Sequence, residues 1–304
     1  MSIAEKLKKV EIGKGFIAAL DQSGGSTPKA LKNYGIGEDQ YSNDEEMFAL
    51  VHKMRERIIT SPAFTGEKIL GAILFEKTMD DVIQGIPTVK YLWNELEIVP
   101  FLKIDKGLEE EKDGVQLMKH IPGLDNLLQR AVTAGIFGTK MRSVIHEGSA
   151  NGITAVVKQQ FDVAKQILSH NLIPIIEPEI FIKALDKAVS EQILLEEIHK
   201  NLETLDSNQQ IMLKLTLPEE SDHYRSLVAH KKVLRVVALS GGYDIDEACK
   251  RLANNPGMVA SFSRALTNDL RVDQSEEEFN QTLQDAIDKI YEASVKDIEQ
   301  VQAA

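Results

Sequence analysis

The sequence has little of several features that mark particular classes of protein. Its 304 residues include one cysteine, Cys249, which excludes an intrachain disulfide and any metal site built from several cysteines. A single cysteine suits a reducing compartment, and we expect the cytoplasm. No run of 18 or more uncharged apolar residues occurs, and residues 1–14 are charged and polar. We therefore expect neither a membrane span nor a signal sequence.

Basic residues and aromatic residues are also scarce. There are 35 Lys and Arg against 47 Asp and Glu, a formal net charge of −12, which opposes binding to nucleic acid because phosphate backbones need a basic surface. An anionic ligand must therefore meet a local pocket of positive charge. Aromatic residues make up 6% of the chain, with one Trp and six Tyr, so few rings are available to stack on sugars.

Short apolar segments are the abundant feature. They are rich in Val, Ile, Leu and Phe and alternate with longer stretches of helical periodicity, which favours parallel strands joined by helical crossovers. Eight such units predict an α/β fold, a (β/α)8 TIM barrel, over residues 1–304 as a single domain with a C-terminal outer helix. The predicted strands are 15–21, 68–75, 99–105, 136–141, 173–179, 210–217, 233–240 and 257–262. The clearest predicted helices are 47–60, 125–134, 153–168, 189–205, 244–254 and 279–295.

Four predicted strands carry polar residues at every second position near their carboxyl ends. Side chains of a strand alternate between its faces, so each pair shares one face. The pairs are Lys103 and Asp105, Lys140 and Arg142, Glu177 and Glu179, and Lys214 and Thr216, and the first strand ends in Asp21. Reactive groups of this type of barrel come from the carboxyl ends of its strands, so we expect these residues to share one site.

Lys214 is the most informative of these residues because it interrupts the apolar run 211–217. A buried ammonium either pairs with a carboxylate, reaches water, or loses its proton and becomes a nucleophile. Desolvation and neighbouring cations, such as Lys140 and Lys103, would favour the neutral amine. A neutral amine can attack a ketone to form a protonated imine, an electron sink that allows a carbon–carbon bond two atoms away to break.

Two glycine-containing loops are candidate anion sites. Ser240, Gly241 and Gly242 follow the seventh strand, and Ser263 and Arg264 follow the eighth. Glycine lets backbone N–H groups approach an anion, and loops after strands seven and eight recurrently bind phosphate in this architecture. The loop after the first strand is a second candidate, with Lys103 beside it. It contains Ser23, Gly24, Gly25, Ser26 and Lys29.

Two other chemistries fit the residues less well. The paired Glu177 and Glu179 could suggest a glycosidase, but they are neighbours on one strand and the lysines would have no role. A metal-dependent aldol reaction needs liganding spacing, and no histidine ends a predicted strand in such a pattern. We therefore predict no metal and no cofactor.

These motifs together resemble the class I fructose-1,6-bisphosphate aldolases, particularly the shorter bacterial branch. The resemblance extends from Gly13 to Leu266. The motifs that carry it are Ala19-Leu20-Asp21-Gln22-Ser23-Gly24-Gly25-Ser26, Leu102-Lys103-Ile104-Asp105-Lys106-Gly107, Thr139-Lys140-Met141-Arg142, Pro174-Ile175-Ile176-Glu177-Pro178-Glu179, Met212-Leu213-Lys214 and Leu239-Ser240-Gly241-Gly242.

The resemblance implies a role for each matching residue. Lys214 would form the imine, Glu177 would shuttle protons during dehydration, and Asp21 would accept the C4 hydroxyl proton. Lys140 would assist around the carbinolamine and lower the pKa of the Lys214 amine, and Glu179 would support this network. The C1 phosphate would be held by Ser240, Gly241 and Arg264, with Gly242 and Ser263 beside them. The C6 phosphate would be held by Ser23, Ser26 and Lys103, with Arg142 counted among the phosphate-binding residues.

The chain departs from the animal members of that family at a few positions. Those members usually have Glu at the place of Gln22, a basic residue near that of Ala30 and Gly at that of Ser263. They also end in a tyrosine that helps to protonate the enamine, whereas this chain ends in Ala304, so another group or water would supply that proton.

The predicted function is therefore reversible cleavage of fructose 1,6-bisphosphate to dihydroxyacetone phosphate and glyceraldehyde 3-phosphate, a step of glycolysis and gluconeogenesis. The partners would be small-molecule sugar phosphates, with no nucleic acid and no membrane, and a homo-oligomer is compatible with the family. Two alternatives stay open. One is an imine-forming aldolase or transaldolase acting on another phosphorylated sugar, and the other is a non-catalytic phosphosugar-binding barrel or scaffold.

Overall fold

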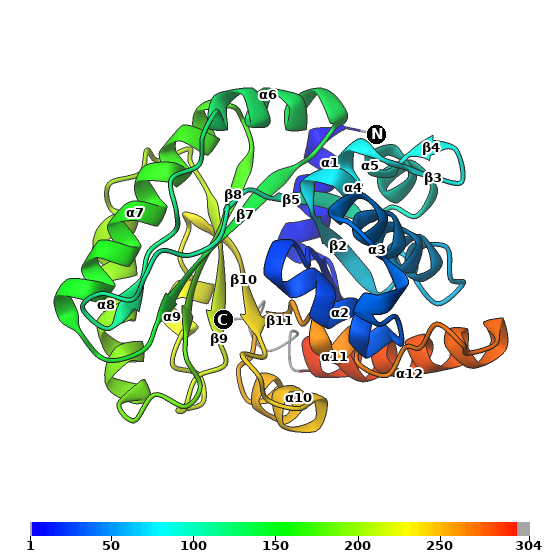
Figure 1. Cartoon of the computed structure of the whole chain (residues 1–304). Coiled ribbons are helices and arrows are strands. Elements are labelled where there is room, and N and C mark those ends of the chain that lie inside the picture. Colours follow the sequence, from blue (N-terminus) through cyan, green and yellow to red (C-terminus); the bar gives the residue numbers. More distant parts are fainter. Residues whose placement is uncertain (1, 297–304) are drawn as a thin grey trace.

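Eight parallel strands form a nearly closed barrel surrounded by helices in the computed structural model, which describes residues 2–296 (Figure 1). Neighbouring strands follow the order β1-β2-β5-β7-β8-β9-β10-β11. The strands are β1 (Phe16–Leu20), β2 (Ile69–Leu74), β5 (Val99–Lys103), β7 (Gly138–Ile145), β8 (Ile173–Ile180), β9 (Ile211–Thr216), β10 (Val233–Leu239) and β11 (Val259–Ala260). Each coincides with a predicted apolar segment, so the predicted (β/α)8 barrel is confirmed.

Two strand boundaries differ from the prediction. The strand predicted at 136–141 continues to Ile145, because it pairs with β8 up to that residue and β6 (Val115–Gln116) pairs antiparallel with its carboxyl end. The strand predicted at 257–262 is only two residues long. β11 pairs with β10, and the Ala260 amide donates to Ser294 Oγ at 3.0 Å instead of extending a ladder.

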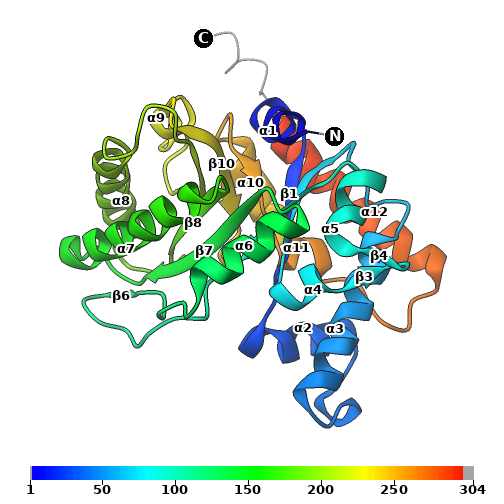
Figure 2. The same cartoon turned by 90° about the horizontal axis from the view of Figure 1, so that it is seen from above.

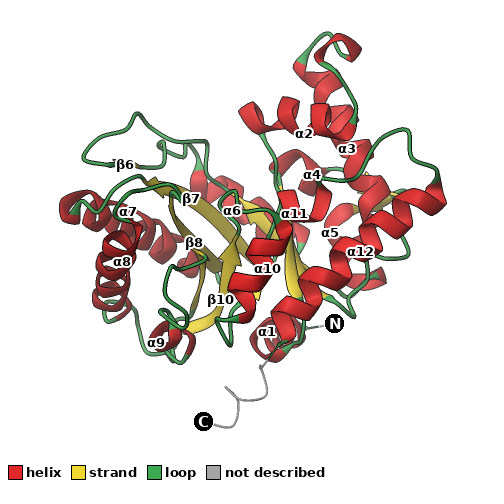
Figure 3. Cartoon of the chain, turned by 90° about the horizontal axis from the view of Figure 1, so that it is seen from below, coloured by secondary structure: helices red, strands yellow, loops and turns green. Residues whose placement is uncertain are grey.

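Helices cover the outside of the barrel (Figure 3). Six match the predicted helices: α3 (Asp44–Ile59), α6 (Leu124–Ala134), α7 (Ala150–Ser169), α8 (Lys187–Leu202), α10 (Ile245–Ala253) and α12 (Glu276–Val295). The others are α1 (Ile3–Ile12), α2 (Thr27–Tyr34), α4 (Glu76–Asp80), α5 (Thr88–Lys90), α9 (Arg225–Val228), α11 (Arg264–Thr267) and the single turns η1 (Gly24–Ser26), η2 (Glu38–Gln40) and η3 (Tyr91–Glu95). A short hairpin is formed by β3 (Val82–Ile83) and β4 (Ile86–Pro87). Across residues 2–296, no helix combines the length and apolar character needed to cross a membrane.

Helix α1 packs at the end of the barrel where the strands begin. It contacts β2, β5 and β10, and its Val10 belongs to the apolar cluster that fills the barrel interior. The buried Arg235 side chain of β10 donates to the carbonyl oxygens of Val10 at 2.9 Å and Gly13 at 2.8 Å. These bonds satisfy two carbonyls at the end of α1, which lack partners within the helix. The opposite end of the barrel, where the strands finish, is left for the site.

Helix α12 packs outside the junction between the first and last strands. It contacts α10, α11, β11 and β1, and it lies along the outside of the barrel in the view from above (Figure 2). It is the predicted C-terminal outer helix. The end of the chain considered above, Ala304, lies outside the described residues.

Candidate active site

The carboxyl ends of four strands bring their polar side chains together inside the barrel mouth. Lys103 of β5 lies in register with Lys140 of β7, and Arg142 of β7 lies in register with Glu177 of β8. Successive side chains of a strand point to opposite faces, so a residue two positions after an inward-facing apolar residue also points inward. In β9, for example, Met212 belongs to the interior cluster and Lys214 follows two residues later.

Lys140 lies at the centre of this cluster and contacts several carboxylates. Its Nζ is 2.7 Å from Asp21 Oδ2, 3.0 Å from Glu177 Oε2 and 3.9 Å from Asp105 Oδ2. The side chain is 3% exposed, so these charges are almost fully removed from water. A buried ammonium needs such partners because water no longer compensates its charge.

The Lys214 amine is held by the same glutamate. Lys214 Nζ lies 3.0 Å from Glu177 Oε1, and both side chains are about 95% buried, with exposures of 5% and 4%. Glu177 therefore has one carboxylate oxygen on Lys214 and the other on Lys140. Its backbone N–H donates to Gln160 Oε1 of α7 at 2.9 Å, which fixes this part of β8. A proton can pass between Glu177 and the Lys214 nitrogen without either side chain moving far.

The charges of this cluster control its protonation. Burial alone would raise the pKa of the Asp21 carboxyl, but the ammonium groups of Lys140 and Lys214 outweigh it and hold this pKa well below its usual range. At Glu177, burial is again outweighed by Lys140 and Lys214, and the pKa is lowered. Burial would lower the pKa of Lys140, but Asp21, Glu177 and Asp105 raise it. Two ionised carboxylates thus flank a protonated Lys140 at neutral pH.

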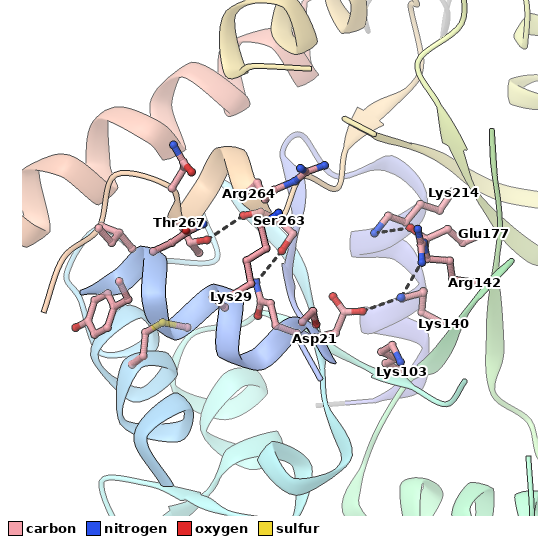
Figure 4. A pocket seen from close by; sticks show the side chains of 18 residues that line it. Asp21, Lys29, Lys103, Lys140, Arg142, Glu177, Lys214, Ser263, Arg264 and Thr267 are labelled. Carbon is pink, nitrogen blue, oxygen red and sulfur yellow. Dashed lines mark hydrogen bonds and ion pairs between the residues drawn. The ribbon is translucent and has the colours of Figure 1, made fainter. Parts of the chain in front are cut away.

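A cavity of about 370 Å³ opens from this cluster (Figure 4). Its inner wall contains the central residues Asp21, Lys140, Glu177 and Lys214, which point toward one another in the close view. The rest of its wall comes from β5 and β7 and from the segments after β1 and β11. That part is lined by Gln22, Ser26, Lys29, Ala30, Asn33, Tyr34, Met54, Lys103, Arg142, Ser263, Arg264, Thr267, Asn268 and Leu270. A cavity of this size is in the usual range for a small-molecule site.

Two basic residues of the cavity wall are paired with carboxylates. Lys103 Nζ lies 2.7 Å from Asp105 Oδ1 and donates to the Asp105 backbone carbonyl at 3.0 Å. Arg142 Nε donates to Glu179, which does not itself line the cavity. For Arg142, burial is outweighed by Glu179 and the pKa is raised. An anion that reached either cation would compete with these carboxylates.

The predicted anion site after β10 and β11 is only partly on the cavity wall. Ser263 and Arg264 line the cavity, whereas Ser240, Gly241 and Gly242 are not among its lining residues. Gly241 and Gly242 have φ angles of 60° and 124°, which a glycine adopts more readily than other residues. A Cβ atom on Gly242 would lie 3.4 Å from Arg264 Nη2, so the guanidinium lies beside this loop.

The predicted anion site after β1 is folded as a tight turn. Ser23 N donates to Ser26 Oγ at 2.9 Å, and Ser26 Oγ donates to the Ser23 carbonyl at 2.9 Å. Ser26 and Lys29 line the cavity, whereas Ser23 does not. The structure therefore places Ser26, Lys29, Lys103 and Arg142 on the lining of the cavity, and Ser23 contributes to the turn without lining it.

The sequence pattern missed several residues of the site. Asp105 is not one of these, because its spacing from Lys103 placed it on the inward face, and it contacts Lys140 there. No such signal exists for the outer wall. Asn33, Tyr34 and Met54 reach the cavity because α2 packs against α3, which depends on a helix that the sequence analysis did not predict.

Within residues 2–296, no group of three or more His, Cys, Asp or Glu side chains has the arrangement of a metal site.

The fold and the site define a (β/α)8 protein with a buried lysine and an ionised cluster at the carboxyl ends of its strands. Residues 1–221 match the profile of the family described as Fructose-bisphosphate aldolase class-I, and the chain belongs to this family. The match includes β1 to β9 and therefore Lys214. Members of this family are lyases that bind sugar phosphates.

Solved structures show the same fold. A fructose-bisphosphate aldolase from Plasmodium falciparum, solved in complex with TRAP and a small-molecule inhibitor, has a TM-score of 0.75 at 24% identity, covering 97% of this chain and 94% of that one. An archaeal fructose 1,6-bisphosphate aldolase has a TM-score of 0.57 at 11% identity, covering 95% and 99%. A Schiff-base-forming fructose-1,6-bisphosphate aldolase studied through its reaction intermediates has a TM-score of 0.55 at 13% identity, covering 95% and 100%.

Proposed function

We propose that the chain cleaves fructose 1,6-bisphosphate reversibly to dihydroxyacetone phosphate and glyceraldehyde 3-phosphate through an imine on Lys214. The observation that carries this proposal is the position of Glu177, with one carboxylate oxygen 3.0 Å from Lys214 Nζ and the other 3.0 Å from Lys140 Nζ. Family membership supports an aldolase reaction, and this geometry supplies the nucleophile and the acid/base group that imine chemistry needs.

The first step is addition of the Lys214 amine to the C2 carbonyl. Lys214 first gives a proton to the adjacent Glu177 carboxylate. The neutral nitrogen then forms a bond to C2 while the carbonyl π electrons move to oxygen, and a proton moves from the nitrogen to this oxygen, which gives a carbinolamine. Glu177 then delivers a second proton to this oxygen, and the oxygen leaves as water. The nitrogen lone pair forms the iminium bond. Lys140 stabilises the negative charge that stays on Glu177 after this transfer.

The second step breaks the bond between C3 and C4. Asp21 accepts the proton of the C4 hydroxyl, the electron pair on that oxygen forms the aldehyde carbonyl, and the electrons of the C3–C4 bond move into the iminium to give an enamine. The lowered pKa of Asp21 keeps this carboxylate ionised and ready to accept a proton. Protonation of the enamine at C3 and hydrolysis of the imine release dihydroxyacetone phosphate and restore Lys214.

The two phosphates would lie on opposite sides of the Lys214 amine. Arg264 and Ser263 on the cavity wall, with Ser240, Gly241 and Gly242 behind the guanidinium, would bind the C1 phosphate. Lys103, Arg142 and Ser26, with Ser23 behind Ser26, would bind the C6 phosphate. Guanidinium and ammonium groups favour phosphate as a ligand. The remaining group of this proposal, Glu179, would orient Arg142 through their hydrogen bond.

Reductive trapping tests the proposal directly. The protein is incubated with dihydroxyacetone phosphate and borohydride, and peptide mass mapping then locates the adduct. We expect the adduct on Lys214 and none in Lys214→Met, whose apolar side chain of similar length can occupy the same buried position. Lys158→Met, at an exposed surface lysine, is the matched control and should be trapped normally. An adduct on another lysine would overturn the assignment.

The cellular setting follows from the same proposal. The reaction would be a step of glycolysis or gluconeogenesis, and the single cysteine suits the reducing cytoplasm. It would proceed without a metal or other cofactor because the iminium is the electron sink. Assembly into a homo-oligomer stays a prediction.

A further inference from the structure

The junction between β1 and β11 differs from the other junctions of the barrel. In the described part of the chain the order of hydrogen-bonded strands starts at β1 and ends at β11, and these two strands are in contact without a paired register. The Ala260 amide of β11 donates to Ser294 Oγ of α12. We call this junction the seam. Backbone ladders do not set the relative position of the two segments that leave the barrel here, so side chains must do so.

A side-chain hydrogen bond crosses the seam at the cavity. Gln22 Nε2 donates to Ser263 Oγ at 2.7 Å, and both residues line the cavity. Gln22 directly follows Asp21, and Ser263 directly precedes Arg264. The Gln22–Ser263 bridge therefore connects the residue next to the proposed base with the residue next to the proposed C1-phosphate ligand.

At the Gln22 end of the bridge, a buried arginine holds the backbone of Gln22. Arg55 of α3 is 1% exposed, and its Nη2 donates to the Gln22 backbone carbonyl while its Nη1 donates to Thr78 Oγ1 at 2.8 Å. A guanidinium has fixed donor geometry, so two bonds from one group leave little freedom for the carbonyl that it holds. The backbone after Asp21 is thus fixed to α3 and α4.

At the other end of the bridge, Ser263 does not cap the helix that follows it. Ser263 occupies the position before the first residue of α11, where a serine hydroxyl normally accepts a hydrogen bond from the helix backbone. It makes no such bond, and its hydroxyl accepts the Gln22 amide instead. Because Arg264 is the first residue of α11, the bridge sets the place where the Arg264 side chain begins.

We propose that Gln22 is a positioning residue that sets the separation between Asp21 and Arg264 across the seam. The bridge would select sugar phosphates whose C4 hydroxyl reaches Asp21 while their C1 phosphate lies on Arg264. A shift of about 1 Å in a positioned group can reduce the rate about a hundredfold, so holding this separation matters for turnover. The proposal rests on the function proposed above.

Two substitutions and their combination test the bridge. Gln22→Met keeps the length of the side chain and removes the donor, and Ser263→Ala removes the acceptor. We expect Gln22→Met to reduce kcat/KM for fructose 1,6-bisphosphate about fivefold, the value of one ordinary hydrogen bond. Ser263→Ala should reduce it at least as much, because the Ser263 hydroxyl is also a proposed ligand of the C1 phosphate. The double variant should lose no more than Ser263→Ala alone, because both substitutions break the same bond. Borohydride trapping with dihydroxyacetone, which has neither phosphate nor C4 hydroxyl, should stay at the wild-type rate.

Hydrogen–deuterium exchange gives a second measurement that needs no turnover. Backbone amides of residues 262–268 should exchange faster in both single variants, to the same extent. Gln116→Met is the matched control, since Gln116 also makes a side-chain hydrogen bond at the barrel mouth, to His146 at 2.9 Å, but does not line the cavity. It should leave the exchange of residues 262–268 and kcat/KM unchanged.

The outcomes separate this inference from the proposed function. If the wild-type protein showed neither turnover nor trapping, the proposed function would be wrong. The exchange measurement would still decide whether the bridge holds α11. Unchanged kcat/KM in the single variants, or losses that multiply in the double variant, would overturn the positioning role. Unequal exchange in the two single variants would overturn the bridge itself.

Discussion

Lys140 Nζ lies 2.7 Å from Asp21 Oδ2, closer than its contact with Glu177 Oε2 at 3.0 Å. The ammonium group therefore joins the carboxylate proposed as the base to the carboxylate that contacts Lys214. Lys140 does not face the Lys214 amine as an unpaired cation, because buried carboxylates surround it. The sequence analysis expected Lys140 to act on the Lys214 amine, and the contacts that connect the two residues run through Glu177.

A substitution at Asp21 is predicted to slow cleavage of the carbon–carbon bond and to leave imine formation intact. Asp21→Asn should lower kcat for fructose 1,6-bisphosphate by about 10³, within the usual contribution of a general base, because an amide cannot accept the C4 hydroxyl proton. Trapping of dihydroxyacetone phosphate by borohydride should continue. Asp125→Asn, at an exposed aspartate that binds His170, is the control. A fast Asp21→Asn enzyme would refute the assigned role.

Lys103 is predicted to distinguish substrates that carry two phosphates from substrates that carry one. Lys103→Met should raise KM for fructose 1,6-bisphosphate about tenfold, because a charge-assisted contact with the C6 phosphate is lost. KM for fructose 1-phosphate, measured in parallel, should change much less and serves as the internal control. Equal effects on the two substrates would mean that Lys103 acts through its partner Asp105 and not through the second phosphate.

The lowered pKa values of Asp21 and Glu177 predict sensitivity to acid. In the unfolded chain these carboxyls have pKa values of about 3.9 and 4.3. The stability that they contribute is complete above those values and is lost as the pH falls through the lower values of the folded chain. Lys140, with a raised pKa, contributes stability that is lost only in strong alkali.

Urea unfolding of wild type and Asp21→Asn measures this contribution. The stability difference between the two proteins, wild type minus variant, should shrink as the pH is lowered from about 6 to about 3, because only the wild type loses the contribution of an ionised Asp21. A difference that grows on acidification would contradict the lowered pKa of Asp21.

The amino-terminal helix is predicted to depend on Arg235. Arg235→Met should lower the free energy of unfolding by about 1–3 kcal/mol, because it leaves the carbonyls of Val10 and Gly13 without their donors. Its kcat should stay near the wild-type value, since the site lies at the other end of the barrel. Arg225→Met, at an exposed arginine paired with Asp222, should leave stability nearly unchanged. Equal stability of the two variants would contradict the role given to Arg235.

Cofactor-free chemistry predicts insensitivity to chelators. Dialysis against excess EDTA should leave kcat for fructose 1,6-bisphosphate within error of the untreated protein, because the iminium withdraws electrons without a Lewis acid. Activity that disappears on dialysis and returns with zinc would show that the imine mechanism is wrong.

The fold was predictable to a large extent because its signals are local. Each barrel strand coincides with a short apolar segment, and the inward side of β8 follows from the spacing of Glu177 and Glu179. Strand ends were less predictable where tertiary contacts decide them. The extension of β7 to Ile145 depends on its pairing with β6 and β8, and the shortness of β11 depends on the seam.

The sequence alone determined the alternation of strands and helices, the face on which the charged residues lie, and the presence of a lysine in the apolar strand β9. These properties repeat with the period of a strand or helix, so neighbouring residues specify them. Only the tertiary structure decided that Glu177 lies between Lys140 and Lys214, that α2 and α3 form the outer cavity wall, and that Gln22 meets Ser263. Such contacts join residues far apart in the chain, and they exist only after the barrel has closed around its core.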